Sequence, residues 1–112
     1  MDCVFCSIVR GEIPARKVYE DDLCIAFYDI APQTPIHIVV IPKMHINTTD
    51  EMTPANMMVL GHMMEKIPCI ARLGGIFHGY RVVTNVGDDA GQTISHLHLH
   101  ILGGKRLSEM MG

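Results

Sequence analysis

The amino-acid sequence predicts an α+β fold, with an antiparallel sheet of about five strands, one main helix and a short N-terminal helix. Three strand-like segments precede a single long helical segment, and two more follow it. No repeat, low-complexity tract or Ser/Gly-rich linker divides the 112 residues. A chain of this length buries roughly two thirds of its unfolded surface in a single core. We therefore expect residues 1–112 to form one domain.

Five segments have the composition of strands. Residues 18–19 and 23–28 flank a charged turn and predict two paired strands. Residues 36–41 are β-branched at all but one position, which is typical of a central strand buried on both faces. Residues 80–85 and 96–102 complete the set. This order along the chain favours an antiparallel sheet.

Two segments predict helices. Apolar residues at helical spacing predict a short helix over residues 4–9. The main helix begins with Thr53 as its cap and Pro54 as its first residue, and it extends to about Leu73. Inside it, Pro68 lacks a backbone donor and clashes with the preceding turn, so we expect a kink there or two shorter helices.

Sulfur-containing residues are numerous, with four cysteines and nine methionines. Cys24 and Cys69 lie among apolar neighbours, and we expect both to be buried core thiols. The Cys3-x-x-Cys6 pair suggests reduced thiols or a metal clip before disulfides. The methionines of the main helix are expected to pack in the core or in a dimer interface, and the sequence leaves both readings open: Met57, Met58, Met63 and Met64.

Composition excludes several classes of function. The formal net charge is −3, and phosphate backbones need clustered Lys and Arg, so nucleic acid is not the expected partner. Three Phe, three Tyr and no Trp also disfavour a base-stacking platform. The N-terminus lacks the apolar stretch of a signal peptide, and the longest aliphatic run is far too short to span a membrane. We therefore expect a cytoplasmic protein with no membrane partner.

Three histidines alternate with aliphatic residues near the C-terminus. In an extended strand His96, His98 and His100 share one face, about 6.6 Å apart, and the aliphatic residues share the other. Neutral imidazole is both a metal ligand and a nucleophile, so a metal site and nucleophilic catalysis are both open. The preceding loop contains Gly87 and Gly91, whose backbone amides can approach an anion. This loop favours an anionic ligand.

The segment from His96 to Leu102 matches the pattern His-φ-His-φ-His-φ-φ, and on it the chain resembles the histidine triad family. Further segments extend the resemblance over nearly the whole chain and are similar to the Hint branch, in particular to its purine nucleoside phosphoramidases: Phe5-x-x-Ile8, residues 12–15, 20–22, 26–30, 32–33, 37–46, 91–93 and 102–104. The chain departs from the branch in its tail, residues 105–112, which lacks the usual Trp-Pro-Pro ending.

The resemblance implies hydrolysis of purine nucleoside 5′-phosphoramidates, such as AMP-amine or AMP-lysine conjugates, to the nucleoside monophosphate and an amine. It also implies a homodimer formed through the main helix and the strand over residues 80–85. One alternative within the family is hydrolysis of dinucleoside polyphosphates or nucleotidyl transfer by the same nucleophile. A second alternative, of another class, is a nucleotide-binding interaction module with little turnover.

Roles follow from the resemblance position by position. His98 is the implied nucleophile, which forms a nucleotidyl-histidine intermediate, and His100 contacts the phosphate. Thr93 supplies the hydroxyl that the branch usually takes from Ser, and His37 fits the residue that orients the nucleophilic imidazole. The phosphate-side positions are Asn85, Gly91 and Gln92. The covalent step requires no metal.

The resemblance also implies a nucleoside pocket and a metal site. Asp29 would accept hydrogen bonds from the ribose hydroxyls, and the pocket would be lined by Phe5, Ile8, Ile13, Phe27, Asp29 and Ile30. Some family members join a Cys pair to two histidines in a tetrahedral structural zinc site. The matching residues are Cys3, Cys6, His45 and His96, for which we expect structural zinc, against the alternative of two free surface thiols.

Overall fold

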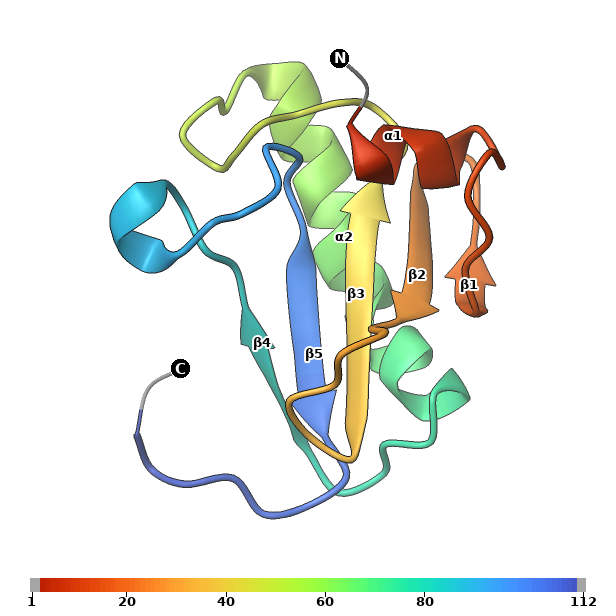
Figure 1. The fold of residues 1–112 in the computed structure, drawn as a ribbon, viewed down its shortest axis with the longest axis vertical. Helices are drawn as coiled ribbons and strands as arrows, with labels where there is room; N and C mark the ends of the chain where they lie inside the picture. The colour runs from red at the N-terminus through yellow and green to blue at the C-terminus, as the bar shows by residue number, and fades with distance from the viewer. Residues whose placement is uncertain (1–2, 111–112) are drawn as a thin grey trace.

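A five-stranded antiparallel sheet forms the centre of the computed structural model, which describes residues 3–110 (Figure 1). The strand order is β1-β2-β3-β5-β4, which confirms the predicted α+β class. In chain order the elements are α1 (Val4–Val9), β1 (Lys17–Glu20), β2 (Cys24–Tyr28), β3 (Ile36–Pro42), α2 (Pro54–Leu73), β4 (Tyr80–Val83), the 3₁₀ turn η1 (Asp88–Ala90) and β5 (Leu99–Gly103).

Strand β3 lies at the centre because its side chains are apolar on both faces. It pairs with β2 on one side and with β5 on the other. Ile38 and Val40 point to the core beneath α2, whereas Val39 and Ile41 point to a second apolar cluster beneath α1. In Figure 1, α2 accordingly lies behind the sheet and α1 lies in front of it. The strand predicted to be buried on both faces is therefore confirmed.

Helix α2 is one helix that continues through Pro68, so the expectation of two shorter helices is wrong. Pro68 lies on the solvent side of the helix, where water can reach the carbonyl that the missing N–H leaves unpaired. The Thr53 hydroxyl accepts a hydrogen bond from the Asn56 N–H at 3.1 Å, as expected of the cap. Within residues 3–110, no helix combines the length and apolar character needed to cross a membrane.

The sulfur-containing side chains of α2 divide between its two faces. Met63 is completely buried, whereas Met57, Met58 and Met64 are exposed. Cys69 is also exposed, which corrects the expectation of a buried thiol, because the buried helical stripe runs through its neighbours Ile67 and Ile70. Cys24 on β2 is buried as expected.

The last two strands are shorter than their apolar patterns indicate. The strand β4 ends at Val83 and β5 begins at Leu99, so residues 96–98 run outside the ladder. Two other hydrogen bonds hold this segment: the Leu97 N–H donates to the Ile46 carbonyl, and the side-chain hydroxyl of Thr84 donates to the His98 carbonyl at 2.8 Å. These two contacts take the place of a neighbouring strand for residues 96–98.

Candidate functional site

The three triad histidines lie on one face of the sheet, as their alternation predicts. The ring of Phe5, on α1, packs edge-on at 5.8 Å from the ring of His96 and 5.1 Å from the ring of His98. The rings of His98 and His100 are 4.9 Å apart between centroids. The intervening aliphatic side chains join the core beneath α2. Both faces are thus covered, and His96 and His98 are buried.

Backbone hydrogen bonding fixes the tautomer of His98. Its Nδ1 lies 2.8 Å from the carbonyl oxygen of His96. A carbonyl only accepts hydrogen bonds, so Nδ1 carries the proton and donates it. In the neutral imidazole the other nitrogen, Nε2, then has a free lone pair. His98 is therefore held in the form in which Nε2 can act as a nucleophile.

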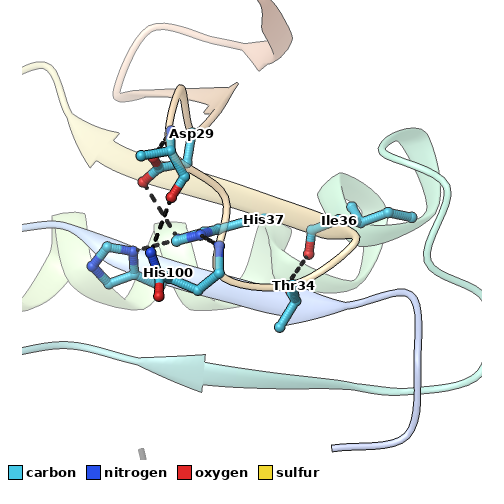
Figure 2. A network of polar contacts seen from close by, with 7 residues as sticks. Asp29, Thr34, Ile36, His37 and His100 are labelled. Atoms are coloured by element: carbon cyan, nitrogen blue, oxygen red, sulfur yellow. Dashed lines mark hydrogen bonds and ion pairs between the residues drawn. The ribbon is translucent and has the colours of Figure 1, made fainter.

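A chain of hydrogen bonds fixes His37 and His100 in the same way (Figure 2). The Gln33 N–H donates to Nδ1 of His37 at 3.0 Å, so the His37 proton is on Nε2. This Nε2 lies 2.8 Å from Nδ1 of His100, which therefore accepts, and it also lies 3.5 Å from the Asp29 carboxylate. The remaining proton of neutral His100 is on its Nε2. His100 thus offers one N–H donor to a ligand.

Burial keeps the imidazoles of His37 and His100 neutral near pH 7. Burial, with smaller contributions from the neighbouring His98 and His37 rings, lowers the pKa of His100 to about 4. Burial also lowers the pKa of His37, although the Asp29 carboxylate acts in the opposite direction. The donor and acceptor roles derived for His37 and His100 therefore hold at physiological pH.

The partner of His37 differs from the one expected. His37 was expected to orient the nucleophilic imidazole of His98, but its ring contacts His100, with 5.0 Å between centroids. The reason is the register of the sheet: His37 pairs with Leu102, and the adjacent Val39 pairs with His100. His98 lies before this ladder begins and is oriented by the His96 carbonyl instead.

The loop before the triad is held by the side chain of Gln92. Its oxygen accepts from the Gly87 N–H at 2.9 Å, and its amide nitrogen donates to the carbonyls of Asn47 and Ile94, each at 3.0 Å. Gln92 therefore shapes the loop with its side chain. Gly91 has a φ of 81°, a conformation that favours glycine.

The other phosphate-side positions lie around this loop. Thr93 and Gly91 are exposed, and Asn85 is partly buried after the end of β4. The Thr93 hydroxyl is thus open to a ligand. Thr93 lies in the loop that leads into the segment of the buried histidines.

The residues expected to line a nucleoside pocket divide into two groups. Phe5, Ile8 and Phe27 are buried in the cluster beneath α1. Ile13 and Ile30 are exposed, and the side chain of Ile30 is completely open to solvent. Asp29 is partly buried; one of its oxygens accepts from the Ala31 N–H at 2.8 Å, and the other lies near His37.

Four potential metal ligands converge at the N-terminal end of α1. The ligating atoms of Cys3, Cys6, His45 and His96 all lie within 4.8 Å of one another. The Sγ of Cys6 is 3.1 Å from Nδ1 of His45, and the Sγ of Cys3 is 3.3 Å from Nδ1 of His96. Tetrahedral zinc with Zn–N of about 2.0 Å and Zn–S of about 2.3 Å brings ligand atoms to similar separations.

The protonation of the two histidines in this cluster fits a cation. Nε2 of His96 donates to the Pro42 carbonyl at 2.9 Å. The Asn47 amide nitrogen faces the Glu51 carboxylate at 3.2 Å, so its oxygen accepts from Nε2 of His45 at 2.8 Å. Both Nδ1 lone pairs therefore face each other, only 3.1 Å apart. These lone pairs can bind a shared cation or accept from the thiols of Cys3 and Cys6. Carbonyl partners on the other ring nitrogen are typical of zinc-ligating histidines.

Three supporting groups were not predicted. These are the Thr84 hydroxyl on the His98 carbonyl, the Gln33 N–H on His37, and the Asn47 amide on His45. The sequence has no local signal for them, because each contact depends on which segments the fold brings together.

Comparisons with known proteins agree with this geometry. Residues 10–107 match the model of the HIT domain. The chain is 50% identical to an uncharacterised HIT-like protein of Synechococcus elongatus, over 96% of this chain and 94% of that protein. It is 42% identical to protein HitA of Neisseria gonorrhoeae, over 91% and 95% of the two chains.

Solved structures extend the likeness to three dimensions. A histidine triad protein from Clostridium difficile superposes with a TM-score of 0.92 at 45% identity, covering 99% of this chain and 97% of that one. A HIT family hydrolase from Clostridium thermocellum superposes with a TM-score of 0.93 at 40% identity, covering 98% and 96%. With its triad on one face of a matching five-stranded sheet, this chain belongs to the HIT, or histidine triad, family.

Proposed function

We propose that this protein is a nucleotidyl hydrolase that cleaves the P–N bond of purine nucleoside 5′-phosphoramidates. The observation that carries the proposal is the hydrogen bond from Nδ1 of His98 to the His96 carbonyl, because it leaves Nε2 with a free lone pair. Solved relatives from Clostridium thermocellum and Legionella pneumophila are named HIT family hydrolases, which supports hydrolysis.

The proposed reaction has two displacements at the α-phosphorus. Nε2 of His98 forms a bond to phosphorus while the bond to the amine nitrogen breaks, and the leaving nitrogen takes up a proton from solvent to become the free amine. Water then attacks the nucleotidyl-histidine and releases the nucleoside monophosphate. The Nε2–H of His100 stabilises charge on a phosphate oxygen, and the exposed hydroxyl of Thr93 is available as a further donor.

The nucleoside side of the site is assigned to Asp29 and the apolar residues around it. The remaining lone pairs of the Asp29 carboxylate can accept hydrogen bonds from the ribose hydroxyls. The contact of Asp29 with His37 links the ribose to the phosphate side of the site. Ile13 and Ile30 are exposed apolar side chains that a purine base could cover, and Phe5, Ile8 and Phe27 are buried in one apolar cluster. The backbone at Asn85 and Gly91 borders the phosphate.

The proposal includes structural zinc on Cys3, Cys6, His45 and His96. The facing Nδ1 lone pairs and the Cys₂His₂ donor set support it. The zinc would hold α1, the segment after β3 and the triad segment together, and the hydrolysis described above is assigned to protein groups alone. Because thiols stay reduced in the cytoplasm, the proposal also locates the protein there.

The proposal also includes a homodimer formed through α2 and β4. Met57, Met58 and Met64 expose 59%, 77% and 47% of their surface on α2. The strand β4 is an edge strand, whose outer side is unpaired within residues 3–110. A second copy of the chain would cover both features at once.

AMP release from an adenosine 5′-phosphoramidate tests the function. We expect turnover by the wild-type chain and a loss of about three orders of magnitude or more in His98→Ala, which should still bind AMP. A diadenosine polyphosphate is assayed in parallel, and its faster cleavage would identify the alternative dinucleoside polyphosphate hydrolase. Binding of AMP without cleavage of either substrate would refute the proposal and favour a nucleotide-binding module.

A further inference from the structure

A hollow with basic walls lies where β5 meets the C-terminal segment. Its volume is about 760 Å³. The loop between β2 and β3 contributes Gln33 and Thr34, and the end of β5 contributes Leu102. The basic side chains of its lining are Arg81, Lys105 and Arg106. Figure 2 shows Thr34 on the same loop that leads to His37, so this hollow adjoins the histidine network.

The register of the sheet puts the hollow on the histidine face. Val83 of β4 pairs with His100, and Arg81 pairs with Leu102. Residues paired across antiparallel strands share a face, and Cα atoms of diagonal neighbours lie about 7–8 Å apart, within reach of long side chains. Arg81 is therefore the diagonal neighbour of His100 on the face that carries the candidate nucleophile.

The order of the strands separates the two ends of a substrate. Asp29, assigned to the ribose, follows β2 and lies on the β3 side of His100. Arg81 is on β4, on the other side of β5. A nucleotide that spans the site from Asp29 to His100 would thus direct its leaving group toward Arg81 and the hollow.

Basic side chains outnumber carboxylates in the described lining of this hollow. Elsewhere on the protein, Lys17 and Lys43 pair with Glu20, and Lys66 pairs with Glu65. Within residues 3–110, the three basic residues of the hollow form no ion pair. Arg81 donates to the Ser108 carbonyl at 2.6 Å, which occupies one of its five N–H donors. Glu109 is the single carboxylate of the described lining.

We infer that Arg81, Lys105 and Arg106 form a subsite for a second anionic group, carried by the leaving amine. The inference rests on the proposed phosphoramidase function and names its substrate class: phosphoramidates whose amine bears a carboxylate or a phosphate. Arg presents paired N–H donors that match either group, and Lys adds a mobile charge. A neutral amine of the same length would leave these charges unused.

Matched substrates test the subsite. The AMP conjugate of 5-aminopentanoate carries a carboxylate, the conjugate of its amide is neutral, and the conjugate of phosphoethanolamine carries a phosphate. We expect the wild-type chain to cleave both anionic conjugates with a KM about fivefold to tenfold below that of the amide conjugate, an advantage that salt reduces. The anionic conjugate with the lower KM shows whether the subsite prefers a carboxylate or a phosphate. Equal KM values for all three would overturn the inference.

Substitutions of the basic residues test whether the KM difference between the conjugates arises at the hollow. Lys105 and Arg106 are exposed, so the double variant Lys105→Gln/Arg106→Gln should fold normally. We expect it to raise KM for the anionic conjugates about fivefold, with the amide conjugate unchanged. The control variant Lys17→Gln/Lys66→Gln removes the same charge elsewhere and should change neither KM. Equal losses for all three substrates would mean a structural role only and would reject the subsite.

A binding measurement separates this inference from the proposed function. Calorimetry with His98→Ala measures affinity for the carboxylate and amide conjugates without turnover. Tighter binding of the carboxylate conjugate, abolished by adding Lys105→Gln/Arg106→Gln, supports the subsite even if the wild-type chain releases no AMP. Equal affinities would reject the subsite even if AMP release is fast.

Discussion

At the residue scale, two backbone groups determine the protonation of the candidate site. The His96 carbonyl can only accept and the Gln33 N–H can only donate, so each fixes the tautomer of the imidazole that it contacts. The hydrogen bond from His37 to His100 fixes the tautomer of His100 in turn. The result is a free lone pair on His98 beside an N–H donor on His100, arranged before any ligand binds.

The stability of the protein should therefore depend on pH through His100. Its pKa is about 4 when folded and near 6.5 when unfolded, so the unfolded chain binds more protons between these values. The stabilising effect of neutral His100 is complete above pH 6.5 and is lost as the pH falls toward 4. Urea unfolding of the wild-type chain and of His100→Gln checks this. We expect the wild type to lose more free energy of unfolding than the variant over this range, and parallel curves would contradict the pKa assignment.

At the element scale, a side-chain hydroxyl binds the backbone of the triad segment at the point where backbone pairing between β4 and β5 ends. Strand β4 ends at Val83, and the next residue, Thr84, donates its side-chain hydroxyl to the His98 carbonyl. This contact holds the nucleophile's backbone where pairing between β4 and β5 has ended. The β-sheet therefore positions His100 directly, whereas His98 depends on side-chain and backbone contacts outside the ladder.

Thr84→Val should expose this dependence. The valine has the same shape but leaves the His98 carbonyl without its donor, which we expect to cost about 1 kcal/mol in the free energy of unfolding. The rate of AMP release should fall about tenfold because the nucleophile loses its position. Thr84→Ser keeps the hydroxyl and should restore most of the rate. A Thr84→Val variant with full activity would show that the segment needs no such support.

At the scale of the whole molecule, the Cys/His cluster joins parts of the chain that are far apart in sequence. Cys3 and Cys6 belong to the N-terminal turn, His45 follows β3, and His96 begins the triad. Helix α1 has only six residues, too few for a stable isolated helix. A metal at this point would fasten α1, and with it the Phe5 ring, against the triad face.

Zinc removal tests this connection. We expect one zinc per chain by elemental analysis of anaerobically purified protein, and chelation should lower Tm by about 10 °C. Cys3→Ser/Cys6→Ser should abolish zinc binding, whereas Cys69→Ser removes an exposed thiol outside the cluster and should leave the zinc content unchanged. Zinc-free protein with an unchanged Tm would exclude the structural role.

The assembly of two chains is the second property of the whole molecule. Met57→Glu/Met64→Glu puts charge on the exposed side of α2, which should convert a dimer into monomers in sedimentation experiments. The control Lys17→Glu changes an exposed residue on β1, at the opposite edge of the sheet, and should leave the dimer intact. If the wild-type chain sediments as a monomer, the proposed interface is wrong.

Local patterns in the sequence determined much of the fold. The alternation over residues 96–101, the β-branched run over 36–41 and the Thr53-Pro54 start of α2 each encode a structure that depends on the residues themselves and their neighbours. The family resemblance additionally predicted which cysteines and histidines come together, and they do.

Only the tertiary structure decided which groups meet across the sheet. His37 contacts His100, and Arg81 becomes the neighbour of His100, because the register of three strands aligns residues that no local pattern relates. The same holds for Cys69, whose exposure depends on how α2 is rotated against the sheet, and for the early end of β4 at Val83. A periodic pattern fixes the face of a side chain, but packing between distant segments fixes its partners.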